Sequence, residues 1–166
     1  RAMDESASSS NTSAAKFENL VEALEWLQQA ANAKHKPSMI LLANTILTDL
    51  VRYILHAQTT ASTTSTHVAE TLFIARPSNP AVETSVNLSE EVQNTLSASP
   101  TLAVSINNLL TTAAQWYIES SLSPNPHSDG LFNLGKLYYD GDLIAADWPK
   151  SFGYFLQAAE LGEMYM

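Results

Sequence analysis

Four histidines and no cysteines limit the metal and nucleophile chemistry of this 166-residue chain. His35, His56, His67 and His127 are dispersed, and none has a carboxylate or a second histidine at metal-ligand spacing on one helix face. The absence of cysteine excludes disulfides, thiolate metal sites and cysteine nucleophiles. We therefore expect the chain to bind no metal ion and no cofactor.

Two further segments carry groups that could bind a ligand or be modified. Asp140-Gly141-Asp142 lacks the alternating acidic ligands and the final Glu of a calcium loop, so a turn between helices explains it better. The Thr- and Ser-rich segment 59–66 could accept phosphate or a sugar, although a flexible linker explains its composition. The chain has no Gly-rich phosphate loop, nucleophile elbow or poised carboxylate pair. We expect a protein that is not an enzyme.

Composition narrows the class of protein and of partner. Seventeen acidic side chains against eight Lys and Arg give a net charge of -9, which repels nucleic acid and anionic membrane surfaces. Hydrophobic residues make up 45% and charged residues 15%, as in a globular or solenoidal chain. The most apolar stretch, 39–57, contains Asp49, Arg52 and His56, which favours a buried helix over a membrane span.

Five segments carry apolar residues at three- and four-residue steps, which predicts an all-α chain without strands. Pro37, Pro100 and Pro124 separate several of these segments. The expected helices cover residues 14–33, about 38–56, 101–122, about 129–140 and 148–161. Residues 1–13 are expected as a disordered lead, and a further short helix is expected at 67–75.

Several residues have the chemistry of helix ends. The segment 11–13 and Ser128 or Asp129 are the expected caps of the first and fourth helices, and Asp147 is the expected N-cap of the last. Gly141 is expected to end the fourth helix in the left-handed conformation, and Gly162 to lie just beyond the last.

Aligning the predicted helices shows an internal repeat. One helix type carries a small residue, an aromatic residue three positions later and a closing small pair. The pattern has three copies. The small residue and the aromatic residue are Ala23 and Trp26 in the first copy, Ala113 and Trp116 in the second, and Ser151 and Tyr154 in the third, and the closing pairs are 30–31, 120–121 and 158–159. The other type has two copies, in which Ser38, Leu42, Ala43 and Ile46 correspond to Gly130, Leu134, Gly135 and Tyr138.

These positions carry a family resemblance. The segment 130–162, with Leu134-Gly135, Gly141, Asp147 and Ala158-Ala159, closely resembles a Sel-one-like repeat, a relative of the ~34-residue tetratricopeptide repeat. The match over 22–43 is weaker and departs from the family at Lys34 and Asp49. The resemblance divides a single domain, 14–166, into four parts. These are a partial repeat (14–33), a repeat with a long insertion at about 57–100 (38–122), a complete repeat (129–162) and the start of another (163–166).

The resemblance implies an α/α superhelix that acts as an adaptor or scaffold for another protein or peptide, as does the adaptor of the ER-associated-degradation ubiquitin ligase. The alternative is a regulatory or targeting repeat region of a larger enzyme such as a kinase. In related solenoids the first helix of each hairpin lines a concave wall. The residues expected to contact a partner there are Asn44, Thr48, Lys136 and Tyr139.

The C-terminal end predicts a second surface. A new repeat begins at Met164-Tyr165-Met166 without a polar capping helix, so we expect either continuation of the natural protein or docking and self-association at this end. Within the insertion, residues 86–96 are compatible with a short docking helix or with a mobile segment. The sequence is compatible with a location in the cytoplasm or in the ER lumen.

Overall fold

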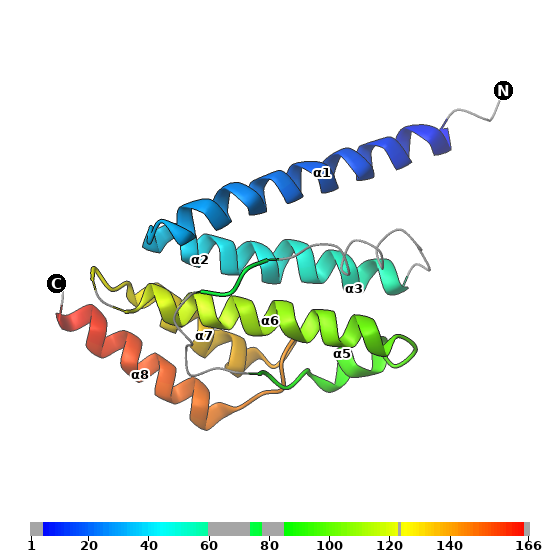
Figure 1. The fold of residues 1–166 in the computed structure, drawn as a ribbon. Helices are drawn as coiled ribbons and strands as arrows, with labels where there is room; N and C mark the ends of the chain where they lie inside the picture. Colours follow the sequence, from blue (N-terminus) through cyan, green and yellow to red (C-terminus); the bar gives the residue numbers. More distant parts are fainter. Residues whose placement is uncertain (1–4, 60–73, 78–84, 123, 165–166) are drawn as a thin grey trace.

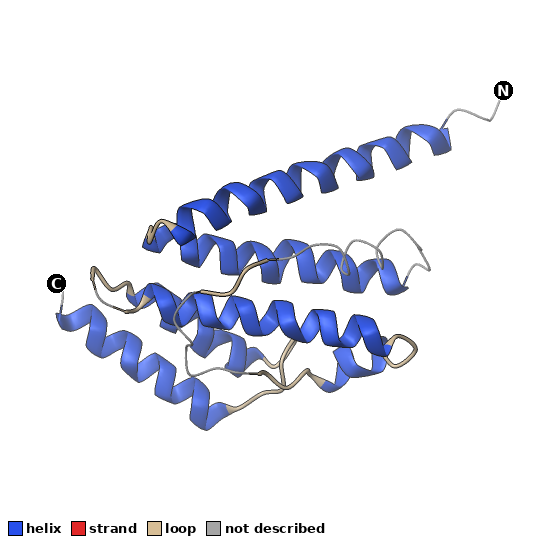
Figure 2. Cartoon of the chain, in the orientation of Figure 1, coloured by secondary structure: helices blue, strands red, loops and turns tan. Residues whose placement is uncertain are grey.

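The fold is all-α, as predicted. A computed structural model of the chain describes residues 5–59, 74–77, 85–122 and 124–164, and most of these residues are helical (Figure 1). The described residues include no strand (Figure 2). The helical segments are α1 (Glu5–Asn32), α2 (Lys36–Thr45), the π-helix η1 (Ile46–Val51), α3 (Arg52–Thr59), α5 (Glu90–Thr95), α6 (Pro100–Ser120), α7 (Ser128–Asp140) and α8 (Trp148–Met164).

The long helices pack in an order that follows the chain. Helix α1 packs on α2, α2 on α6, α6 on α7 and α7 on α8. Each of these helices runs roughly antiparallel to the one before it (Figure 1). Helix α2, η1 and α3 join into one continuous rod, and the short α5 packs on α3.

Apolar faces at helical spacing drive this packing, because each stripe must be covered by a neighbouring helix. Helix α6 lies at the centre, and its residues 109–117 are buried on all sides. The largest fully buried side chains, which belong mainly to α2, η1, α3 and α6, are Trp116, Met39, Leu42, Ile46, Leu50, Ile54, Leu102, Ile106, Leu110, Leu134, Ile144 and Val51. The core therefore contains side chains from both the N-terminal and the C-terminal half of the chain, and α6 lies between these halves.

The rod from Lys36 to Thr59 is long and apolar enough to cross a membrane by length and composition, and half of its most apolar window is buried inside the fold (50%). Its buried apolar side chains from 39 to 54 belong to the same core cluster as those of α6. This packing favours its interpretation as a core helix.

Several helix ends lie where the sequence predicts them. The Asp147 carboxylate accepts a hydrogen bond from the backbone N–H of Lys150 at 3.0 Å, which satisfies one free donor at the start of α8. Gly141 has φ 70°, the left-handed conformation that lets the chain leave α7. Pro100 lies in the first turn of α6, where its missing N–H breaks no helical bond.

Three helix ends differ from the prediction. Helix α1 begins at Glu5 and includes the segment 11–13, so its start lies in the stretch expected as a disordered lead. No Pro or Gly interrupts that stretch. Helix α7 is preceded by His127 as its N-cap, which makes no side-chain capping bond. Helix α8 continues past Gly162 to Met164, and Gly162 does not have the positive φ of a left-handed helix end.

The predicted insertion is structured where it is described. Ser89 caps α5 by accepting a hydrogen bond from the N–H of Val92 at 3.3 Å. An isolated antiparallel bridge joins Leu88 to Ile144, and the Ser89 N–H donates to the carbonyl of Leu143 at 3.1 Å. The insertion is thereby tied to the turn between α7 and α8. Most of the short helix expected at 67–75, and the segment 60–66, lie outside the described residues.

Candidate interaction surfaces

The residues predicted to line a concave wall lie on α2, η1 and α7, and most of them are exposed. Thr48, Lys136 and Tyr139 face solvent. Asn44 is half-buried, because its Oδ1 accepts hydrogen bonds from the Tyr117 hydroxyl and, at 3.5 Å, from the amide of Asn133. The expectation that Asn44 points outward is therefore wrong. Its side chain joins α2, α6 and α7 instead.

Helix α7 presents an exposed face with two aromatic rings, and Phe132 of this face was not among the residues predicted to contact a partner. Phe132, Lys136 and Tyr139 are all exposed and lie one turn apart on the same side of α7. Phe132 lies against Phe155 of α8, with ring centroids 5.3 Å apart. The i, i+4, i+7 spacing was visible in the sequence, and it indicates a face with aromatic rings at both ends and a cation between them.

Helix α8 carries the most exposed apolar surface of the described C-terminal half. Trp148, Phe152 and Leu156 are 70%, 69% and 49% exposed and follow one another at four-residue steps. We name these three residues the α8 stripe. Of the predicted self-association end, Tyr165 and Met166 lie outside the described residues, and Met164 closes α8 without a described side chain. The α8 stripe adds an apolar face earlier in the same helix.

The internal repeat makes the exposure of the α8 stripe informative. In the alignment that pairs Trp116 with Tyr154, the α8 stripe corresponds to Leu110, Ala114 and Ile118 of α6. Leu110 and Ala114 are fully buried, and Ile118 packs on the core as a partly buried side chain. The same helix positions are thus covered on α6 and uncovered on α8.

The three aromatic residues of the repeat pattern have different surroundings. Trp116 is buried in the core, and Tyr154 is half-buried and stacks on Tyr138 with centroids 5.9 Å apart. Trp26 is 64% exposed, so this copy of the repeated aromatic residue does not fill a gap between the described helices. Among the described residues, helix α1 packs on α2 and η1, and its Phe17 stacks on Tyr53 of α3, whereas Trp26 on the opposite side of α1 is left exposed.

The glycines of α7 and α8 also distinguish helix faces that pack within the chain from a helix face that does not. A Cβ at Gly130 would overlap with the hydroxyl of Ser120 and the carbonyl oxygen of Tyr117, and one at Gly135 would lie 2.8 Å from the Phe155 ring. A Cβ at Gly153 would meet nothing within 4 Å. The first two glycines allow close helix packing within the chain, whereas no contact within the described chain requires the third.

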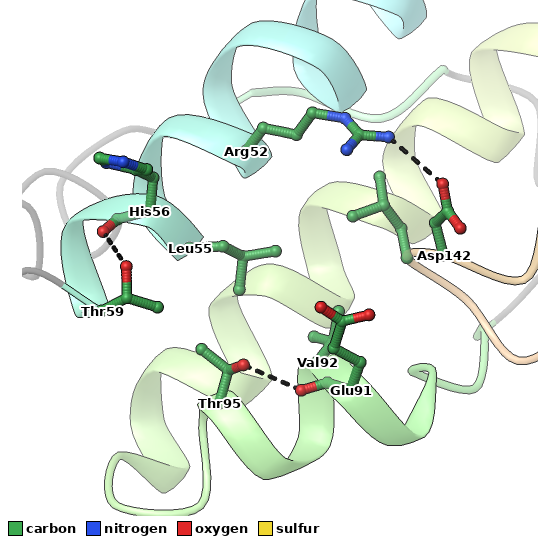
Figure 3. Close-up of a pocket in the computed structure, with 9 residues that line it drawn as sticks. Arg52, Leu55, His56, Thr59, Glu91, Val92, Thr95 and Asp142 are labelled. Carbon is green, nitrogen blue, oxygen red and sulfur yellow. Dashed lines mark hydrogen bonds and ion pairs between the residues drawn. The ribbon is translucent and has the colours of Figure 1, made fainter.

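Described residues line a cavity at each of two opposite ends of the helix stack. The first, of about 540 Å³, lies between α3, α5 and the turn that follows α7 (Figure 3). The Arg52 guanidinium and the Asp142 carboxylate face each other at its edge, 3.7 Å apart, and Leu55 and Val92 form an apolar wall. Both charged groups are exposed, so solvent weakens this ion pair. The second cavity, of about 570 Å³, lies between the α1–α2 turn and the segment that connects α6 to α7.

The described residues contain no group of three or more His, Cys, Asp or Glu side chains that could hold a metal ion. Comparison of the chain with family models, with curated proteins and with solved structures finds no match. The resemblance to Sel-one-like repeats therefore depends on the residues quoted above.

Proposed function

We propose that the chain is a non-catalytic protein-interaction module of stacked helical hairpins, an adaptor or scaffold that binds a partner helix across the α8 stripe. The observation that supports this proposal is the exposure of Trp148, Phe152 and Leu156 at positions that are covered on α6. In a stack of repeats, each hairpin contacts only its neighbours, so an apolar helix face that no described helix covers is a candidate packing face. A helix from another molecule would cover the α8 stripe as a neighbouring helix covers α6.

Gly153 adds a second argument for a helix as the bound element. A glycine in a helix interior destabilises that helix by about 1 kcal/mol relative to alanine. Gly153 lies one helical turn before Leu156 of the α8 stripe, and a Cβ at Gly153 would meet no atom within 4 Å. Small residues allow two helix axes to approach closely, which Gly130 and Gly135 do within this chain. A helix packed over Gly153 would make use of that space.

The spacing of the α8 stripe suits a second copy of the chain. Trp148 and Leu156 lie at equal distances in sequence on either side of Phe152. In a two-fold antiparallel pair of α8 helices centred on Phe152, each Trp148 would face the partner's Leu156. We therefore propose a homodimer as the simplest complex of this module.

Sedimentation equilibrium over a range of concentrations tests the proposal. We expect reversible dimerisation that Phe152→Ser weakens by about tenfold or more, because burying one such aromatic side chain stabilises by about 1.5–3 kcal/mol. Trp148→Ser should act in the same direction. Trp26→Ser is the matched control, because it removes an exposed tryptophan from α1, and it should leave the dissociation constant unchanged. A chain that stays monomeric at high concentration, or equal effects of Trp148→Ser and Trp26→Ser, would refute the proposal.

A further inference from the structure

Helix α1 carries one copy of the repeated pattern on a side that the described residues leave largely uncovered. We name Ala23, Trp26 and Ala30 the hairpin face of α1. Ala23 and Trp26 are exposed, and Ala30 is half-buried. The corresponding residues are Ala113, Trp116 and Ser120 on α6, and Ser151, Tyr154 and Ala158 on α8. All of these are buried except Tyr154, which is half-buried. The same positions are therefore covered in the other two copies.

Helix α8 shows what packs on this face. The Ser151 hydroxyl donates to the carbonyl oxygen of Gly135 at 2.7 Å, and the Tyr154 ring stacks on Tyr138. Both partners belong to α7, the first helix of the same hairpin. Helices α2 and α6 pack on each other as the other hairpin. A helix that covers the hairpin face of α1 in the same way carries a small residue at the place of Gly135 and a larger side chain three positions later.

A second copy of the described chain offers no free helix of this type. Among the described helices the pattern of Gly135 and Tyr138 recurs only on α2, and both α2 and α7 are already packed in their own hairpins. On the other side of α1, Leu24 and Ala31 are buried in the core that α1 shares with α2. A helix that covers the hairpin face therefore comes from another protein.

Three carboxylates lie beside the hairpin face. Glu18 and Glu22 precede Trp26 at four-residue steps, and Glu25 lies three residues after Glu22. All three are exposed, and none of them forms an ion pair with another residue in the described part of the chain. Lys16 is the single cationic residue in the sequence of α1. Electrostatic complementarity therefore favours a basic helix over an acidic one as the partner.

The repeat also indicates where the charge of that partner lies. Glu22 occupies on α1 the position of Lys150 on α8, one residue before the small residue of the pattern. Lys150 reaches across to α7, where its Nζ donates to the Tyr138 hydroxyl at 3.0 Å and lies 4.6 Å from the centroid of that ring. A carboxylate is repelled by the negative face of an aromatic ring and attracted by a cation. The partner residue at the place of Tyr138 is therefore basic, and an arginine there can stack on Trp26 while it pairs with Glu22.

We propose that the hairpin face of α1 binds a basic amphipathic helix of another protein. A glycine or alanine of that helix packs on Ala23, and an arginine three residues later lies between the Trp26 ring and the Glu22 carboxylate. Helices α1 and α8 are the first and the last in the packing order of the long helices, so this surface is separate from the α8 stripe (Figure 1). The proposal depends on the internal repeat and not on dimerisation through the α8 stripe.

An exposed tryptophan alone needs no partner, because single apolar side chains are common on protein surfaces. Two features of α1 go beyond that explanation. Ala23 and Ala30 are small residues at positions where α6 and α8 use small residues for close helix packing. Glu22 replaces the lysine that crosses the hairpin of α7 and α8, so the charge at this position is reversed. A basic helix packed on the hairpin face explains both features.

Two synthetic peptides with the sequence of α7, Ser128–Asp140, test the proposal. One carries Tyr138→Arg and the other Tyr138→Glu, and a side-chain bridge between positions 132 and 136, which are exposed on α7, keeps both peptides helical. Each peptide is titrated into the isotope-labelled chain at neutral pH and low salt. The indole N–H signals in the NMR spectrum, assigned with Trp26→Phe and Trp148→Phe, report where the peptide binds. We expect the Arg peptide to shift the Trp26 signal and to bind at least about fivefold more tightly than the Glu peptide.

Two variants of α1 complete the test. Glu22→Gln should reduce the preference for the Arg peptide to about twofold or less, because it removes the paired carboxylate. Glu90→Gln on α5 is its control, because it removes an exposed carboxylate from another helix, and it should leave the preference unchanged. Ala23→Leu should weaken binding of the Arg peptide by about tenfold, because the larger side chain holds the two helices apart. Ala23 is exposed, so the circular dichroism of this variant should match that of the wild type.

Equal affinities for the two peptides, no shift of the Trp26 signal at millimolar peptide, or an Ala23→Leu variant that binds normally would overturn the proposal. A Trp26 signal that moves with the concentration of the chain alone would also overturn it, because the hairpin face would then bind a second copy. The dimer proposed at the α8 stripe is followed separately through the Trp148 signal, and its absence would leave this test intact.

Discussion

Two glycines on neighbouring helices predict opposite effects of the same substitution. Gly130→Ala places a Cβ against the Tyr117 carbonyl oxygen and the Ser120 hydroxyl, and the carbonyl carbon of Tyr117 lies 3.2 Å away. The carbonyl belongs to the backbone of α6 and cannot rotate away, so α6 and α7 must separate. Gly153→Ala meets no atom within 4 Å and removes a flexible residue from α8.

The expected magnitudes follow from these surroundings. Overpacking a tight contact costs about 1–3 kcal/mol, and alanine recovers about 1 kcal/mol of helix propensity over glycine. For Gly130→Ala we take the upper end of the packing cost, because backbone is involved, and expect a net loss of about 2 kcal/mol. Gly153→Ala should gain about 0.8–1 kcal/mol. For a chain of this size, 1 kcal/mol shifts Tm by about 2–4 °C.

Thermal unfolding followed by circular dichroism measures both effects at a concentration low enough to keep the chain monomeric. We expect Tm to fall by about 4–8 °C in Gly130→Ala and to rise by about 2–4 °C in Gly153→Ala. A Gly130→Ala variant that melts at or above the wild-type temperature would refute the close contact of α6 with α7. A lowered Tm in Gly153→Ala would show that the isolated chain already covers that side of α8.

Three further substitutions test single contacts. Burial raises the pKa of the Tyr117 phenol above its ordinary value of 10.0, so its contribution to stability is present below pH 10 and is lost as pH rises further. Tyr117→Phe should remove that alkaline loss from urea-unfolding curves and cost about 1–2 kcal/mol at neutral pH, because it also deletes the bond to Asn44. Ser151→Ala deletes a buried 2.7 Å bond to the Gly135 carbonyl and should lower unfolding free energy by about 1 kcal/mol. Tyr139→Ala should change the free energy of unfolding by less than about 0.5 kcal/mol, because Tyr139 is exposed. If α7 is a contact face, this variant should capture less of a partner from the native cell, and unchanged capture would show that Tyr139 does not contact the partner.

Local rules predicted much of the fold from the sequence. Periodic apolar residues identified the long helices, and Asp147, Gly141 and Pro100 marked ends that depend on only a few neighbouring residues. The start of α1 was harder to predict, because the Ser- and Ala-rich lead neither demands nor forbids a helix. Gly162 has the composition of a helix end, but its backbone does not adopt the conformation of one.

The candidate surfaces were less predictable, because burial depends on which neighbours a helix acquires. Trp26 and Trp116 occupy the same repeat position, yet Trp26 is exposed and Trp116 is buried, because the described helices contact α1 on one side only. The sequence predicts Asn44 as an outward polar residue, whereas its side chain accepts a hydrogen bond from Tyr117, which is distant in sequence. The cavity lined by His35 and His127 brings together residues far apart in the chain, and no local sequence pattern predicts this contact.

The π-helix η1 gives the long rod two directions of contact. One additional residue per turn rotates everything after it by about 100° relative to an uninterrupted α-helix. The side chains before η1 meet α1 and α6, whereas α3 beyond it packs on α5 and reaches α1 through Tyr53, which stacks on Phe17. Deleting one residue from Ile46–Val51 would therefore turn Leu55 and His56 away from the first cavity without shortening the rod appreciably. The geometry of that cavity depends on the phase of a helix whose altered turn lies outside the cavity lining.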